Sequence, residues 1–130
     1  MGNGQNNASL NTLSHKVIGC AIEVHRELGP GFLESVYEEA LCLELTSNKI
    51  PFKQQHEIGV SYKGHTVGKG RIDILIDETI VLELKTIERF EPIHSAQVIS
   101  YLKATQYPLG LLINFNVPVL KQGIKRLILT

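Results

Sequence analysis

The sequence contains no tryptophan, one methionine and only two cysteines among its 130 residues. Cys20 and Cys42 lie in separate segments and form no CxxC pair, so the sequence predicts no zinc or iron–sulfur site. No apolar run approaches the roughly 18 residues of a membrane span, and the polar N-terminus lacks the apolar centre of a signal peptide. We therefore expect a reduced, cytoplasmic protein with no membrane partner.

The chain also lacks an excess of charge of either sign, because 13 Lys and Arg residues balance 13 Asp and Glu residues. A protein that coats nucleic acid through bulk charge is normally basic, so the sequence does not indicate that class. Hydrophobic residues make up 43% of the chain, enough to bury a core at this length. Residues 1–12 are rich in Asn and predict a flexible tail, and residues 13–130 predict a single domain.

Hydrophobic periodicity predicts a mixed α/β domain. The second expected helix places Leu33 and Val36 on its buried side, and Pro92 suits the first position of the third. The final segment, 124–129, fits either a strand or a short helix. The expected helices are 13–28, about 33–47 and 92–105, and the expected strands are 55–62, 66–76, 80–87 and 109–115.

Candidate chemistry lies on the second and third expected strands. If these strands form a hairpin across residues 77–79, Asp73 and Glu83 come together, and Lys85 shares the strand face of Glu83. Two carboxylates and a lysine are the groups that metal-assisted phosphodiester hydrolysis requires. A charged, solvated strand face is the alternative. Aspartate is disfavoured inside strands, and Asp73 is one of only two in the chain, which favours a functional role.

Two helices add further candidates. Glu34 falls within the apolar arc of its helix and Glu38 at the edge of that arc, where an unpaired carboxylate is costly. The alternative for Glu34 is a favourable interaction with the helix dipole. Gln97 and Tyr101, four residues apart on the third helix, share a face that suits ligand binding or simple packing.

Several stretches occur in the order found in bacterial GxxExxY proteins, which are grouped with the PD-(D/E)xK nuclease superfamily. Together they extend the resemblance from His15 to about Leu129, in a RecB-like branch. The chain has Ile72 where many relatives have proline. The stretches are residues 25–31 (HRELGPG), 31–37 (GFLESVY), 71–73 (RID), 83–85 (ELK), 97–101 (QVISY) and 111–115 (LLINF).

The resemblance implies a restriction-endonuclease-like αβββαβ core, with a mixed central sheet flanked by helices. It also implies a Mg²⁺ or Mn²⁺ site. Asp73 and Glu83 would be metal ligands, Glu34 would complete the site, and Lys85 would be the catalytic lysine. The carbonyl of Leu84 is a further implied ligand. The implied supporting or substrate-binding residues are Gln97, Tyr101, Arg71 and Glu38.

The leading hypothesis is therefore a metal-dependent nuclease, with DNA favoured over RNA as substrate. The alternative is a catalytically silent module that keeps the nuclease fold and binds nucleic acid or protein. A homodimer or larger complex is left open. We also expect some of the later basic residues to form a local track for the phosphate backbone. These are Lys63, Lys69, Arg71, Lys121, Lys125 and Arg126.

Overall fold

The computed structural model describes residues 3–129, with side chains from Ala8 onward. Its elements are α1 (Asn3–Leu28), α2 (Glu34–Ser47), β1 (Phe52–Tyr62), β2 (His65–Ile76), β3 (Ile80–Lys85), α3 (Pro92–Thr105), β4 (Leu109–Asn114), a 3₁₀ turn η1 (Leu120–Gly123) and β5 (Ile124–Leu127). The five strands form one sheet in the order β1-β2-β3-β4-β5. Only β3 and β4 pair in parallel, so the sheet is mixed, as expected.

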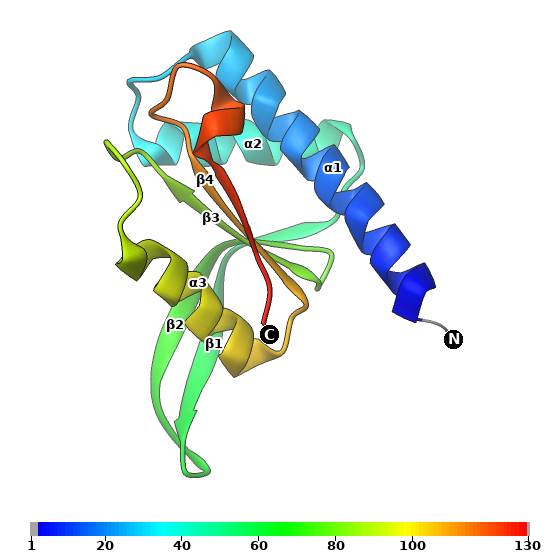
Figure 1. The fold of residues 1–130 in the computed structure, drawn as a ribbon, viewed down its shortest axis with the longest axis vertical. Coiled ribbons are helices and arrows are strands. Elements are labelled where there is room, and N and C mark those ends of the chain that lie inside the picture. The colour runs from blue at the N-terminus through cyan, green and yellow to red at the C-terminus, as the bar shows by residue number, and fades with distance from the viewer. Residues whose placement is uncertain (1–2, 130) are drawn as a thin grey trace.

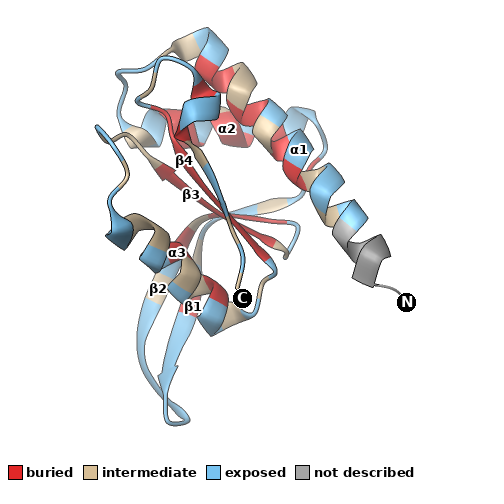
Figure 2. Cartoon of the chain, viewed as in Figure 1, coloured by how far each residue is buried: buried red, intermediate tan, exposed pale blue. Residues whose placement is uncertain are grey.

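Helices cover both faces of the sheet (Figure 1). On one face, α1 and α2 pack against Ile74, Leu82 and Leu111, and on the other, α3 packs against Leu75 and Leu112. The central strands β3 and β4 are almost entirely buried (Figure 2). Continuous apolar runs such as residues 109–113 are typical of strands that are covered on both sides. The order of elements confirms the predicted mixed α/β fold class.

The first helix begins at Asn3, inside the range 1–12 that the sequence analysis assigned to a flexible tail. Contacts with distant residues account for the difference in the later part of this range. Leu10 packs against the core, and Asn11 Oδ1 accepts a hydrogen bond from Arg126 Nη2 at 2.6 Å. Tertiary contacts of this kind override the low helix propensity of asparagine. Residues 1–2 of the predicted tail lie outside the described residues.

The entry to α2 is set by one buried tyrosine. Gly29 and Gly31 both have positive φ and end α1 abruptly. The hydroxyl of Tyr37 donates to the Gly29 carbonyl and accepts from the Phe32 N–H at 3.2 Å. Its ring stacks on Phe115, with ring centroids 4.5 Å apart. The loop before α2 is therefore fixed to the sheet through a side chain in the helix that follows.

The prediction that Leu33 and Val36 are buried was wrong, since they are 75% and 38% exposed. Leu33 is the N-cap of α2 and lies outside its helical face. Tyr37, Leu41 and Leu45 recur every four residues and are fully buried, so they turn Val36 toward the surface. The final segment, for which helix and strand were both open, is a strand.

The helix α3 packs tightly on the sheet at Gly110, where an added Cβ would lie 2.4 Å from Val98 Cγ1. We predict that Gly110→Ala lowers the free energy of unfolding by about 1–3 kcal/mol through overpacking. Adding Val98→Ala makes room, so the double variant loses less than the sum of the single losses. Urea unfolding measures all three.

The matched control is Gly19→Ala in α1, where an added Cβ would meet nothing within 4 Å. This change should leave stability unchanged or raise it by up to about 1 kcal/mol, because alanine favours helix. Strictly additive losses at positions 98 and 110 would contradict the close packing of α3 on β4.

Candidate active site

The candidate site forms where the ladder between β2 and β3 stops. The hairpin turns at Asp77 and Glu78, both with positive φ, and its strands pair from Ile76–Ile80 to Ile74–Leu82. The next pair would be Asp73 and Glu83, but the backbones separate there. The predicted hairpin thus brings these two carboxylates to the place where β2 and β3 separate.

Each carboxylate takes the place of a backbone carbonyl on the opposite strand. Glu83 Oε2 accepts a hydrogen bond from the Asp73 N–H at 2.8 Å, and Asp73 Oδ2 accepts one from the Leu84 N–H at 2.8 Å. Buried N–H groups without a partner are costly, so this exchange stabilises the gap between the strands. We call this pair of hydrogen bonds the carboxylate clasp.

The strand bends at Asp73, which the sequence pattern did not reveal. Simple alternation places Ile72 and Ile74 on one face, but Ile72 packs in the cluster under α3 and Ile74 in the cluster under α1 and α2. Opposite Asp73, Gln55 has a positive φ of 53° and is missing from the β1–β2 register. Regular alternation therefore breaks at this position, opposite an irregularity in β1 that bends the neighbouring strand.

Burial makes the clasp electrostatically costly. Burial, and next the negative charge of Asp73, raise the pKa of Glu83 to about 8, against the opposing effects of the Asp73 N–H and Lys85. Burial also raises the pKa of Asp73, although the hydrogen bond from Leu84 opposes this shift. The pair therefore holds more negative charge than its protein surroundings neutralise.

The third carboxylate comes from α2. Glu34 is the first residue of that helix and is half-buried. Burial and the charge of Asp73 raise the pKa of Glu34, while Lys85 lowers it. The loop fixed by Tyr37 therefore sets Glu34 where it interacts with Asp73 and Lys85, the residues with which the sequence analysis grouped it.

Glu38 is more buried than Glu34, the reverse of their predicted order. Its carboxylate accepts hydrogen bonds from Gln54 Nε2 at 2.7 Å and from Gln55 Nε2 at 2.9 Å. Two amides from the irregular part of β1 thus hold Glu38 and tie α2 to this strand. Neither glutamine was predicted as a site residue, because the sequence shows only two adjacent amide side chains near the start of a strand.

Lys85 ends β3 and is half-buried beside the carboxylates, where it lowers the pKa of all three. Arg71 is exposed and lowers the pKa of Asp73. Asn114, in β4, pairs with Lys85 in β3. Its side chain holds the segment after β3 through two hydrogen bonds with the backbone of Ile87. Among residues 3–129, the four ion pairs found lie elsewhere, so the carboxylates have no direct cationic partner.

Gln97 and Tyr101 lie on α3, on the opposite side of the sheet from α2. Gln97 is exposed. Tyr101 packs under β2, where a Cβ at Gly70 would lie 2.8 Å from its Cε1. This contact fits the packing alternative for Tyr101, and the supporting roles assigned to both residues stay predictions.

The donor chemistry of the site suits a hard divalent cation, although the carboxylates are not gathered around one point. In the part of the chain that the structure describes, no group of three or more His, Cys, Asp or Glu side chains forms a ready metal cluster. Asp73 and Glu83 point instead to backbone N–H groups. Their raised pKa values, and that of Glu34, show negative charge that a cation would relieve.

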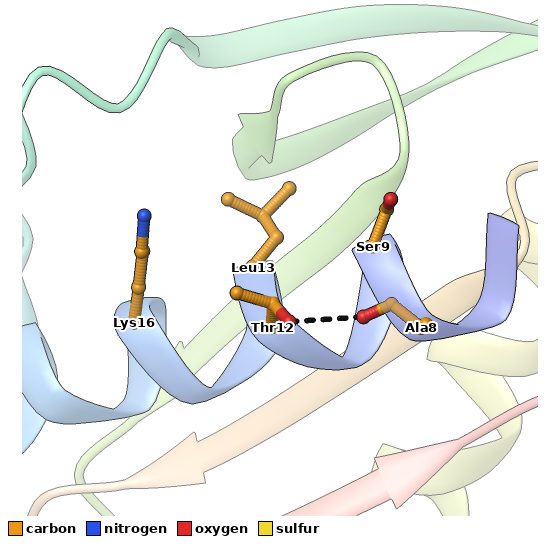
Figure 3. A pocket seen from close by; sticks show the side chains of 5 residues that line it. All are labelled: Ala8, Ser9, Thr12, Leu13 and Lys16. Carbon is orange, nitrogen blue, oxygen red and sulfur yellow. Dashed lines mark hydrogen bonds between the residues drawn. The ribbon is translucent and has the colours of Figure 1, made fainter. Parts of the chain in front are cut away.

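A separate hollow lies along α1 and offers different chemistry. It is lined by Ala8, Ser9, Thr12, Leu13 and Lys16, and the Thr12 hydroxyl donates to the Ala8 carbonyl (Figure 3). No carboxylate lines it, so it does not compete with the clasp as a site for a cation. None of the helices in residues 3–129 is long and apolar enough to cross a membrane.

Comparison with known proteins agrees with the geometry. Residues 11–127 match the family model described as the PD-(D/E)XK nuclease superfamily, which covers the sheet, the three helices and the carboxylate clasp. No curated protein and no solved structure gives a significant match. The match spans most of the chain and accounts for the restriction-endonuclease-like order of its elements. The chain therefore belongs to the PD-(D/E)XK nuclease superfamily.

Proposed function

We propose that this protein is a divalent-metal-dependent nuclease that hydrolyses phosphodiester bonds of DNA. Its superfamily supports a nuclease-type function acting on nucleic acid in general. The observation that carries the proposal is the carboxylate clasp, in which the half-buried Asp73 and the buried Glu83 each bind an N–H of the opposite strand, with Lys85 nearby. The narrower resemblance to GxxExxY proteins and to the RecB-like branch belongs to this proposal.

Asp73, Glu83 and Glu34, with the Leu84 carbonyl, are the groups that would hold Mg²⁺ or Mn²⁺. Bound there, the cation would supply Lewis-acid activation of water and neutralise charge on the phosphate. The buried chain around the clasp fixes the two carboxylates, and Glu38 keeps α2 against β1. Lys85 orients the attacking water. The water oxygen gives up a proton to solvent and bonds to phosphorus, one phosphorus–oxygen bond breaks, and the leaving oxygen takes up a proton.

Activity is tested with a pair of aspartate variants that make the same chemical change at two positions. Asp73→Asn keeps an oxygen that accepts the Leu84 N–H but removes the charge, so DNA cleavage with Mg²⁺ or Mn²⁺ should fall at least about 100-fold. Asp77→Asn changes the chain's other aspartate, which is exposed in the hairpin turn, and should leave cleavage unchanged. Plasmid, single-stranded DNA and RNA serve as substrates.

Lys85→Ala should cause a comparable loss, with the exposed Lys103→Ala as its control. Equal cleavage by Asp73→Asn, Lys85→Ala and the unmodified protein would reject the assignment. Cation-dependent cleavage of RNA but not DNA would keep the site and change the substrate. Cation binding without cleavage of any substrate would support the alternative, a catalytically silent module that keeps the nuclease fold.

The raised pKa of Glu83 predicts how stability depends on pH without divalent cations. The folded pKa of about 8 lies above the unfolded value of 4.5, so the folded state favours the protonated form. Its stabilisation is fully present below pH 4.5 and is lost as pH rises toward 8, by at most about 1.4 kcal/mol per pH unit. Urea unfolding between pH 5 and 8 should show this loss, and Glu83→Gln should flatten it.

Adding Mn²⁺ at pH 8 should restore stability to the unmodified protein, because a cation that binds only the folded state stabilises it. Glu83→Gln should gain much less. An identical pH dependence in both proteins would show that Glu83 is not the buried titrating group.

A further inference from the structure

The hairpin of β1 and β2 extends well beyond the part of the sheet that it shares with β3. The two strands pair over ten register positions, but β2 pairs with β3 only from Ile74 to Ile76. The remainder projects from the body of the molecule (Figure 1), and residues 59–69 are all exposed (Figure 2). We call residues 57–71 the arm. At about 3.3 Å per residue, the part of β2 in the arm, from His65 to Arg71, spans roughly 20 Å.

The arm is locally basic in a chain with no net charge. Lys63, Lys69 and Arg71 stand against one carboxylate, Glu57, which gives the arm a net charge of 3 − 1 = +2. Lys69 and Arg71 are two residues apart and share a face. Gly70 between them rests on Tyr101, so both cations face away from α3.

These cations are weakly engaged within the chain. Lys69 Nζ lies 3.6 Å from Glu57 Oε1 in an exposed pair, which contributes little stability. Lys63 Nζ lies 5.4 Å from the centre of the exposed Tyr62 ring, so a cation and an aromatic ring stand together near the tip. By contrast, Arg126 is hydrogen-bonded to Ser14 and Asn11, and Lys125 lies over Phe90. The arm therefore groups three of the six basic residues predicted to form a track, on a surface open to an outside partner.

Gly59 lies in the arm beside the register shift between Val60 and Ser61. Gly59 pairs with Lys69 on the charged face, yet its φ is not positive and an added Cβ would meet nothing within 4 Å. Gly68 on the opposite face is equally unconstrained. Glycine in a strand often accompanies such an irregularity, and at position 59 it also leaves the backbone bare beside Lys69.

The arm also leads into the site. Asp73 follows Arg71 by two residues, so the row of cations on β2 ends beside the carboxylate clasp. Positive charge next to an acidic pocket lets a polyanion approach carboxylates that would otherwise repel it.

We propose that the arm binds the sugar–phosphate backbone of nucleic acid and holds it against the carboxylate site. This inference rests on the proposed function for the identity of the partner. Charge complementarity favours a polyanion as the partner, because three of the four charged side chains of the arm are positive. The bare backbone at Gly59 lets a phosphate approach between Lys69 and the edge strand.

Two double variants with the same net charge test the location of binding. Lys63→Gln/Lys69→Gln removes two arm charges, and Lys16→Gln/Lys103→Gln removes two exposed charges elsewhere. Both are made in the Asp73→Asn background to prevent cleavage. Fluorescence anisotropy with a labelled DNA duplex measures affinity across a range of salt concentrations. Arg71 is left unchanged because it lies beside the site.

The arm variant should bind at least about tenfold more weakly at low salt. Its slope of log affinity against log salt should fall in magnitude by about two, one unit for each lost phosphate contact. The control pair should keep the slope of the parent. Gly59→Val should weaken binding without lowering the urea midpoint, because valine favours strands and the site has room.

Equal slopes for the arm and control variants, or no binding of DNA by the parent, would overturn the arm proposal. So would an arm-dependent dimer in sedimentation together with unchanged DNA affinity, since that result would make the arm an interface between copies. Cleavage by the unmodified protein is measured separately on the same duplex. If the unmodified protein cleaves the duplex but the arm variant binds DNA as tightly as its parent, only the proposed role of the arm is refuted. If binding depends on the arm but the unmodified protein cleaves nothing, only the proposed nuclease activity is refuted.

Discussion

Two carboxylates accept the hydrogen bonds that backbone carbonyls would otherwise accept where β2 and β3 separate. Asp73 and Glu83 each bind an N–H of the opposite strand, so the sheet can open without leaving buried donors unsatisfied. The cost is two acidic groups in a buried setting, which raises the pKa of both. The same groups that close the gap in the backbone therefore create a site with excess negative charge.

The rest of the structure brings other elements to that gap. Tyr37 fixes the loop before α2 and so sets Glu34 at the helix start. Gln54 and Gln55 hold Glu38 against the irregular part of β1, opposite the bend at Asp73. The long β1–β2 hairpin starts at the same bend and carries its basic residues outward from the clasp. The proposed site thus depends on one local departure from regular pairing.

Much of the fold followed from sequence, because the signals were local. Alternating apolar residues predicted the β2–β3 hairpin, and Pro92 marked the first residue of α3. The extension of α1 to Asn3 depends on distant contacts such as Asn11 with Arg126, which no local pattern records. The bend at Asp73 depends on Gln55 in a neighbouring strand, so strict alternation misplaced Ile72.

The sequence singled out the members of the candidate site more than it indicated their geometry. The sequence pattern singled out Asp73, Glu83 and Lys85, and the hairpin register brings the two acids together. It did not show that the acids bind backbone N–H groups, because that depends on where the strands part. The apolar arc of its helix singled out Glu34, but only the resemblance to a family grouped it with the other acids, because its distance along the chain hides its interaction with Asp73.

The central claim is that the carboxylate clasp holds a divalent cation. Isothermal titration of Mn²⁺ into the protein at pH 8 tests it directly, with the two aspartate variants compared. We predict saturable binding to the unmodified protein and to Asp77→Asn, and loss of that binding in Asp73→Asn. Equal Mn²⁺ binding by all three proteins, or none by the unmodified protein, would contradict the account.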